Sequence, residues 1–228
     1  MIKAEQIIKS FKSGDTRVTI LRGISFEVRK GEFVSIIGRS GSGKTTLLYQ
    51  LGLLDRPTSG KIFIDSFDVT SLTEQERTAM RLSEFGYVFQ DYALVPELSA
   101  IENVMAPLLM QGMSRHEAKT KAVQALHRVG LPSRVNNLPN QLSGGEQQRV
   151  SIARAIAHNP KILFADEPTA NLDHETSLAI LDAFHELHRA GQTIVMVTHE
   201  LDYAEQTDRI VTLFDGQVTE DKRLTTNN

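Results

Sequence analysis

The stretch FVSIIGRSGSGKTTLLYQ at residues 33–50 constrains the fold more than any other part of the chain. It places an apolar run before a G-x-x-x-x-G-K-[ST] motif and a helical run after it, which is the strand–loop–helix context that this motif requires. The loop glycines let backbone N–H groups surround phosphate oxygens, Lys44 reaches the β and γ phosphates, and the Thr45 hydroxyl can ligate Mg²⁺. A flexible glycine turn is the alternative. The expected phosphate-binding residues are Gly38, Arg39, Ser40, Gly41, Ser42, Gly43, Lys44, Thr45 and Thr46, the last donating to the α-phosphate.

Short, nearly continuous apolar runs recur along the chain. They lie at 33–37, 87–89, 162–165 and 193–197, and they are typical of parallel strands buried on both faces. Helical segments separate them, and one of these, HETSLAILDAFHELHRAG, is expected to place Leu178, Leu181, Phe184 and Leu187 on one stripe before Gly191 ends it. This alternation predicts an α/β core.

Three further regions complete the expected architecture. Alternating patterns at 17–28 and 61–69 predict antiparallel strands at the front. No strand pattern is found at 91–158, where Ser114 and Glu117 form a capping box ahead of a helix that carries an apolar stripe of Ala118, Ala122, Ala125, Leu126 and Val129. Asp215–Gly216 predicts a hairpin turn, and the terminal RLTTNN is expected to be frayed.

The chain as a whole is therefore expected to be one α/β domain, residues 1–228. A P-loop NTPase (RecA-like) core with a mostly parallel sheet would comprise residues 1–90 and 159–228, with an N-terminal antiparallel β subdomain. An α-helical subdomain would be inserted at 91–158.

Composition limits the function classes. The formal net charge of −3 provides no global basic field of the kind that draws a protein onto nucleic acid. There is no cysteine, which excludes disulfides and is compatible with a reducing compartment. The N-terminus lacks the apolar core of a signal peptide, and no apolar stretch is long enough to cross a bilayer. We expect a cytoplasmic protein that reaches a membrane only through a partner.

Two adjacent carboxylates end the apolar run ILFADE at 162–167. Side chains alternate along a strand, so Asp166 and Glu167 should have different environments. Asp166 is the expected Mg²⁺ partner, through water, and Glu167 could accept a proton from an attacking water. An ordinary acidic loop is the alternative when this segment is taken alone.

A second glycine-rich helix start follows at LSGGEQQR, residues 142–149, which we call the signature segment. Ser143 and Glu146 form a capping box there. A cap needs no consecutive glycines, which weaken a helix, whereas glycine permits close approach to the backbone. The approaching group is expected to be anionic.

With these motifs in this order, the chain resembles the nucleotide-binding subunit of ATP-binding cassette (ABC) transporters along nearly its whole length. In that family two copies face each other head to tail, so the resemblance implies a homodimer that closes around ATP. Ser143, Gly144 and Gly145 of one subunit would grip the γ-phosphate of ATP bound by the other. ATP, Mg²⁺ and ATP hydrolysis are implied with it.

The resemblance assigns several residues individually. Gln90, in YVFQD, matches the family's glutamine that reaches Mg²⁺ and water, although a glutamine here would ordinarily be a polar loop residue. His199, in MVTHE, matches the histidine that contacts the γ-phosphate, although a lone histidine is more often structural. Asn171-Leu172-Asp173 corresponds to the family's inter-subunit aspartate loop, with Asn171 in place of the commoner Ala. Phe11 matches the ring that stacks on adenine, with a core phenylalanine as the alternative.

The resemblance also implies partners. GLLDRPTSG and GYVFQDYALVPELSAIENV are most similar to the lipoprotein-release and macrolide-export branch. Integral membrane subunits and a position on the cytoplasmic face of the inner membrane would follow. Soluble ABC ATPases of DNA repair or translation are the alternative, disfavoured because the chain has one cassette, no long coiled coil, no cysteine and no sustained basic patch.

Overall fold

The computed structural model describes residues 1–14 and 16–224, so the end of the predicted frayed tail lies outside the described residues. The chain forms two compact units. Unit 1 comprises Met1–Ala79 and Gly191–Asn228, unit 2 comprises Met80–Ala190, and each is described by itself. The chain passes from one to the other within α2 (Glu74–Glu84). The subdomain boundaries expected at 90/91 and 158/159 stay a prediction.

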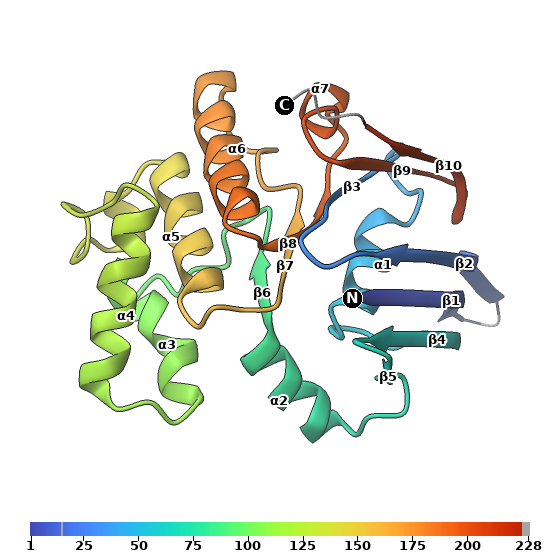
Figure 1. Cartoon of the computed structure of the whole chain (residues 1–228), viewed down its shortest axis with the longest axis horizontal. Helices are drawn as coiled ribbons and strands as arrows, with labels where there is room; N and C mark the ends of the chain where they lie inside the picture. The colour runs from blue at the N-terminus through green and yellow to red at the C-terminus, as the bar shows by residue number, and fades with distance from the viewer. Residues whose placement is uncertain (15, 225–228) are drawn as a thin grey trace. The chain divides into compact units, whose positions relative to one another are not determined.

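Unit 1 contains an antiparallel sheet, as expected for the front of the chain. Its strands are ordered β2 (Thr16–Val28), β1 (Ile2–Ser13), β4 (Ser59–Ile64) and β5 (Phe67–Asp68) (Figure 1). The prediction of one continuous strand at 61–69 is wrong, because a turn divides this segment. Asp65 and Ser66 have φ angles of 48° and 68°, which is the left-handed pair that turns a two-residue hairpin. The segment therefore forms two short strands.

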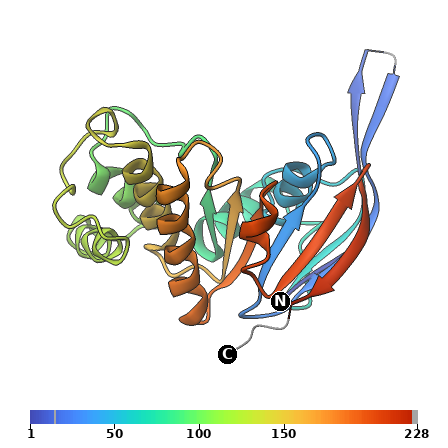
Figure 2. The ribbon, with the colours of Figure 1, turned by 90° about the horizontal axis from the view of Figure 1, so that it is seen from above.

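The sequence pattern did not predict strand β1. Its pairing with β2 and β4 is interrupted near Gln6, whose φ is 50°. This interruption is a β-bulge, which inserts one extra residue into the strand. Ala4 and Ile7 are therefore both buried, although an uninterrupted strand would point them to opposite faces. Pairing of β1 with β4 ends at Ile8. Beyond it, the last residues of β1 and the first residues of β2 form a two-stranded arm (Figure 2).

The other strands of unit 1 form a mostly parallel sheet in the order β10 (Gln217–Arg223), β9 (Arg209–Phe214), β3 (Phe33–Ile37) and β8 (Thr193–Val197). Strands β8, β3 and β9 are parallel, and β10 returns antiparallel through the predicted Asp215–Gly216 turn. All of β8 and nearly all of β3 are buried, as their apolar runs predict. Two helices, α1 (Lys44–Leu51) and α7 (Leu201–Ala204), belong to this unit.

Unit 2 pairs β6 (Phe85–Val88) in parallel with β7 (Ile162–Asp166). Between them lie α3 (Ala100–Met110), α4 (Arg115–Arg128), the 3-10 turn η1 (Pro139–Gln141) and α5 (Gly144–Ile156) (Figure 1). Residues 91–158 contain helices and no strand, as the pattern predicts. The Ser114–Glu117 capping box and the buried stripe of α4 are confirmed.

The stripe expected on α6 (His174–Arg189) needs one correction. Leu181, Phe184 and Leu187 are buried, but Leu178 is 40% exposed and Ile180 is buried instead. At 100° per residue, Leu178 lies about 120° from the centre of this buried face. It therefore falls at the solvent edge of the helix. No helix in the described part of the chain has both the length and the apolar character that crossing a membrane requires.

Candidate nucleotide-binding site

The phosphate loop, residues 38–45, connects β3 to α1 in unit 1. Gly43 precedes the helix with φ of 100°, a left-handed conformation suited to glycine, and a Cβ there would lie 2.8 Å from Leu21 Cδ2. A Cβ on Gly38 would lie only 2.3 Å from the carbonyl oxygen of Leu213. The glycines thus let the loop pack closely against β2 and β9.

The start of α1 suits an anion. Its first turn has no side-chain cap and contains no acidic residue, so backbone N–H groups and the positive end of the helix dipole are not neutralised locally. Ser42 Oγ is buried and makes no hydrogen bond among the described residues. Lys44 is 8% exposed, and its Nζ donates to the carbonyls of Gly38 and Arg39 at 3.0 and 3.3 Å. The loop residues therefore fit a nucleotide phosphate.

His199 lies at the same edge of the unit 1 sheet as the phosphate loop. Val197, the last residue of β8, pairs with Ile36, and the Thr198 N–H donates to the Ile36 carbonyl at 3.2 Å. His199 Nε2 is 3.3 Å from Glu200 Oε1, and both side chains are about half exposed. The carboxyl ends of two neighbouring parallel strands thus bring His199 and the loop to one edge of this unit.

Phe11 is 46% exposed on β1, so it is not a core phenylalanine. Its cross-strand partner is Val18, which is also exposed, and Lys9 Nζ lies 4.9 Å from the ring centre. The ring is therefore available to stack on a flat ligand. Adenine stacking stays a prediction.

The two carboxylates of unit 2 have the different environments that strand alternation predicts. Asp166 ends β7 and is 7% exposed. Glu167 is half-buried and has φ of 46°, which is uncommon for a non-glycine residue, and it precedes Pro168. The strand thus ends in a sharp change of backbone direction that separates the two side chains.

Gln90 and the aspartate loop, residues 171–173, lie together in unit 2. Gln90 follows β6, which is parallel to β7, so it lies at the same sheet edge as Asp166 and Glu167. Asn171 Nδ2 donates to the Gln90 backbone carbonyl at 2.9 Å. Asp173 caps α6 by accepting from the Thr176 N–H at 2.9 Å, and this lowers the pKa of its carboxyl. An alanine at position 171 could not make the first bond.

The signature segment begins α5 with the predicted capping box. Ser143 Oγ accepts from the Glu146 N–H at 3.2 Å, and the Glu146 carboxylate accepts from the Ser143 N–H at 2.8 Å. Arg134 Nε donates to the same carboxylate at 2.8 Å. The Ser143 N–H and Arg134 together hold the pKa of Glu146 below its ordinary value.

The glycines of the signature segment are used within the chain itself. A Cβ on Gly145 would lie 2.3 Å from Thr176 Cγ2, and one on Gly144 would lie 2.9 Å from the Tyr92 hydroxyl and 3.3 Å from Leu172 Cδ2. The inference that the glycines require an approaching anion was therefore incomplete, because neighbouring side chains of unit 2 already need the space. An anionic contact here stays a prediction.

Sequence reasoning assigned no role to two α5 residues that contact the predicted site segments. Gln148 Nε2 donates to the Pro168 carbonyl at 2.7 Å. Arg154 donates to the Tyr92 and Ala93 carbonyls just after Gln90, and burial lowers its pKa. Only the run EQQR pointed to Gln148, and it does not identify an acceptor.

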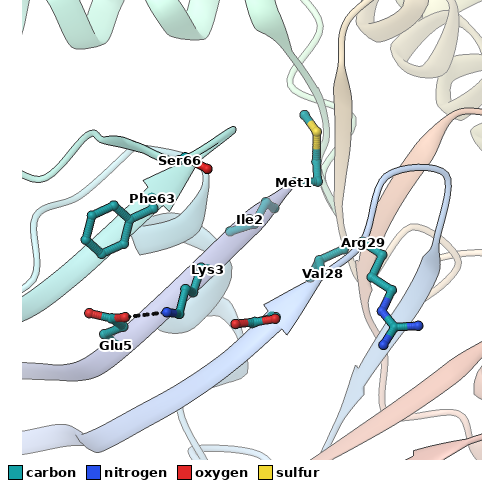
Figure 3. Close-up of a pocket in the computed structure, with 9 residues that line it drawn as sticks. Met1, Ile2, Lys3, Glu5, Val28, Arg29, Phe63 and Ser66 are labelled. Atoms are coloured by element: carbon teal, nitrogen blue, oxygen red, sulfur yellow. Dashed lines mark ion pairs between the residues drawn. The ribbon is translucent and has the colours of Figure 1, made fainter.

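A separate pocket of unit 1 contains none of the predicted site residues. Lys3 and Glu5 form an ion pair of 2.7 Å beside it (Figure 3). It is lined by Met1, Ile2, Lys3, Glu5, Glu27, Val28, Arg29, Phe63 and Ser66. Of its charged residues, Lys3, Glu5 and Glu27 belong to strands β1 and β2, and Arg29 follows β2. We assign this pocket no role.

Comparisons with known proteins agree with the motifs. A family model described as "ABC transporter" matches residues 21–170. The chain is 49% identical over 218 residues to the lipoprotein-releasing system ATP-binding protein LolD of Aquifex aeolicus, covering 96% of each. It is 44% identical to the macrolide export ATP-binding/permease protein MacB of Bartonella henselae, covering 95% of this chain and 33% of that protein. The solved dimeric post-hydrolysis structure of the ATP-binding cassette MJ0796 with ADP and Pi is similar, with a TM-score of 0.92, 41% identity and 99% coverage of both chains.

Proposed function

We propose that this chain, which belongs to the ABC transporter family, couples ATP hydrolysis to movement of separate membrane subunits. It is an α/β ATPase of that family, which binds ATP and works with Mg²⁺. The observation that most supports the assigned phosphate-binding residues is the structure at the start of α1. The helix N-terminus without a side-chain cap, the buried Ser42 hydroxyl and Lys44 provide N–H, O–H and ammonium donors for a triphosphate, and the first turn of α1 contains no acidic residue.

The first step is binding and orientation of ATP. The N–H groups at the start of α1 hold the β-phosphate region, and Lys44 exchanges its two carbonyl bonds for phosphate oxygens. Thr46 donates to the α-phosphate, and the Phe11 face stacks on adenine. Since phosphoryl transfer depends mainly on positioning and charge stabilisation, these contacts fix the γ-phosphate for attack.

The second step is attack by water on the γ-phosphorus, which forms a new P–O bond while the bond to the β–γ bridging oxygen breaks and ADP leaves. Glu167 accepts a hydrogen bond from this water and receives its proton, while His199 donates to a γ-phosphate oxygen. Thr45, Gln90 and Asp166 carry the oxygen donors that Mg²⁺ prefers and would hold it, Asp166 through water. When bound, the ion neutralises charge on the β and γ phosphates.

The third element of the proposal is a homodimer. The solved relative is described as dimeric and bound to ADP and Pi, which supports the same arrangement here. Ser143, Gly144 and Gly145 of one subunit would contact the γ-phosphate held by the other, so ATP would hold the dimer closed. Asp173 would lie near the partner subunit.

The membrane partners are proposed from the relatives' names. LolD is named for lipoprotein release and MacB for macrolide export. We propose that this chain serves a lipoprotein-releasing or macrolide-exporting type of machine, or one that transmits force, from the cytoplasmic face of the inner membrane. No nucleic-acid partner is expected at a net charge of −3.

The test uses the Glu167→Gln variant, which should bind ATP but not turn it over. Size-exclusion chromatography with light scattering should show a monomer with ADP and a dimer with ATP. Loss of the general base should lower phosphate release by about a hundredfold or more. Glu167→Gln that hydrolyses ATP at the wild-type rate would refute the assignment.

A second substitution distinguishes the shared interface from simple nucleotide binding. Ser143→Ala, placed in the Glu167→Gln background, should retain ATP binding and lose the ATP-dependent dimer. Exposed Ser71→Ala in the same background is the control and should still dimerise. A dimer that forms equally well with Ser143→Ala would contradict the role of the signature segment.

A further inference from the structure

Gln148 is a fully buried polar side chain in the middle of α5. Its relative exposure is 0%, and its Nε2 donates to the carbonyl oxygen of Pro168 at 2.7 Å. Both residues belong to unit 2. Gln148 lies one helical turn after Gly144, so it shares a helix face with the start of the signature segment.

The acceptor of this bond adjoins the proposed general base. Pro168 directly follows Glu167, whose φ of 46° lies in a sparsely populated region for a non-glycine residue. A residue before proline is also disfavoured in helical conformations. The backbone that orients the Glu167 carboxylate therefore needs support from its surroundings, and the buried amide of Gln148 supplies one such contact.

The polar side chain is not explained by packing alone. Gln148 Oε1 is buried and makes no hydrogen bond among the described residues, and a buried polar atom without a partner is destabilising. A methionine would fill similar space without that atom. The glutamine at this position therefore makes one N–H···O bond to Pro168 at the cost of a buried oxygen that is unpaired within the described part of the chain.

We infer that Gln148 is a positioning residue that couples the start of α5 to Glu167. This inference rests on the proposed function, in which the start of α5 contacts the partner subunit's nucleotide and Glu167 serves the chain's own nucleotide. Because a helix moves as a rigid element, a displacement of Gly144 and Gly145 reaches the Pro168 carbonyl through Gln148. The start of α5 thereby detects ATP bound by the partner subunit, and Gln148 aligns Glu167 at the ATP bound by its own chain.

The test compares Gln148→Met with Gln147→Met in the full chain. Gln147 is the matched control, since it is the neighbouring glutamine and its amide donates locally to Leu142 at 3.1 Å. Gln148→Met should lower kcat by about 10- to 100-fold through misplacement of the base, with KM for ATP little changed. The Hill coefficient for ATP should fall toward one. Gln147→Met should stay near wild type in each measurement.

A double-mutant cycle separates positioning from general damage. In the Glu167→Gln background, Gln148→Met should lower the residual rate no further, because the group it positions is already lost. The Glu167→Gln, Gln148→Met protein should still form the ATP-bound dimer by light scattering. Gln148→Asn, whose amide is one methylene too short to reach Pro168, should reproduce the loss and serves if the methionine variant unfolds.

The outcomes distinguish this inference from the proposed function. Equal rates for Gln148→Met and Gln147→Met, an unchanged Hill coefficient, or an equal fractional loss in the Glu167→Gln background would overturn the positioning role while leaving the ATPase intact. The proposed function itself would be overturned if the wild-type chain did not hydrolyse ATP and the Glu167→Gln variant did not dimerise with ATP.

Discussion

The starts of α1 and α5 are both glycine-bearing, yet they are built in opposite ways. The start of α1 has a left-handed Gly43 as its N-cap, no side-chain cap and no acid in its first turn. The start of α5 has Ser143 as its N-cap and Glu146 in its first turn, in a closed capping box. The first leaves donors for a ligand, whereas the second satisfies part of its own backbone.

The glycines of both helix starts make room for neighbouring atoms of the same chain. Gly38 and Gly43 let the phosphate loop pack against backbone and side-chain atoms of β9 and β2. Gly144 and Gly145 let side chains of the same unit pack on the helix start. Glycines at both helix starts therefore permit close packing within the chain, and the two starts differ mainly in their caps, because α1 has no side-chain cap whereas α5 has a closed capping box.

The largest expected effect is a loss of ATP affinity when the start of α1 is changed. Lys44→Ala removes the ammonium that the proposal places on the β and γ phosphates, and charged hydrogen bonds of this kind should be worth about 10- to 100-fold in affinity. Isothermal titration calorimetry with ATP measures the affinities of Lys44→Ala and of wild type. Lys30→Ala, at an exposed turn residue, should bind like wild type. Undiminished ATP affinity in Lys44→Ala would place the nucleotide elsewhere.

A smaller effect tests the packing at the second helix start. Gly145→Ala places a methyl group 2.3 Å from Thr176 Cγ2. The overlap should cost about 1–3 kcal/mol of the free energy of unfolding, partly offset by alanine's better helix propensity of about 1 kcal/mol. Urea denaturation measures the difference.

Thr176→Ser provides the matching rescue. It removes the methyl group and keeps the hydroxyl that donates to Asp173 at 2.7 Å. Gly145→Ala should therefore be tolerated in the Thr176→Ser background, which a double-mutant cycle would show as a favourable coupling. The same loss of stability in both backgrounds would mean that Thr176 is not what Gly145 accommodates.

The smallest effect sharpens the electrostatic contrast between the two starts. The pKa of Glu146 is lowered in the folded chain by the Ser143 N–H and Arg134. Its contribution to stability is therefore present above the unfolded pKa of about 4.3 and lost as pH falls through the lower folded pKa. In Glu146→Gln, the free energy of unfolding should fall less steeply below about pH 4.3 than in wild type.

The control for this prediction is Glu186→Gln, a change to an exposed acid of α6. Its acid-side unfolding profile should follow that of wild type. A Glu146→Gln profile that also follows wild type would show that the capping box contributes no pH-dependent stability.

Local patterns in the sequence predicted most of the secondary structure because they report burial and capping directly. The apolar runs of β3, β7 and β8, the two capping boxes and the Asp215–Gly216 turn are confirmed. Strand β1 was missed because the bulge at Gln6 breaks the alternation on which a strand prediction depends. Leu178 was misplaced because spacings of three residues drift around a helix with 3.6 residues per turn.

The sequence by itself determined the family, the α/β class, and which residue types stand at the phosphate loop, the two carboxylates and the signature segment. Each of these is encoded in consecutive residues, so a short window is sufficient. Only the tertiary structure decided that Gly145 faces Thr176, that Asn171 holds the Gln90 carbonyl, and that Gln148 holds the Pro168 carbonyl. These contacts join residues 20 to 81 positions apart in the chain. They depend on how helices and loops pack, and no local periodicity records that choice.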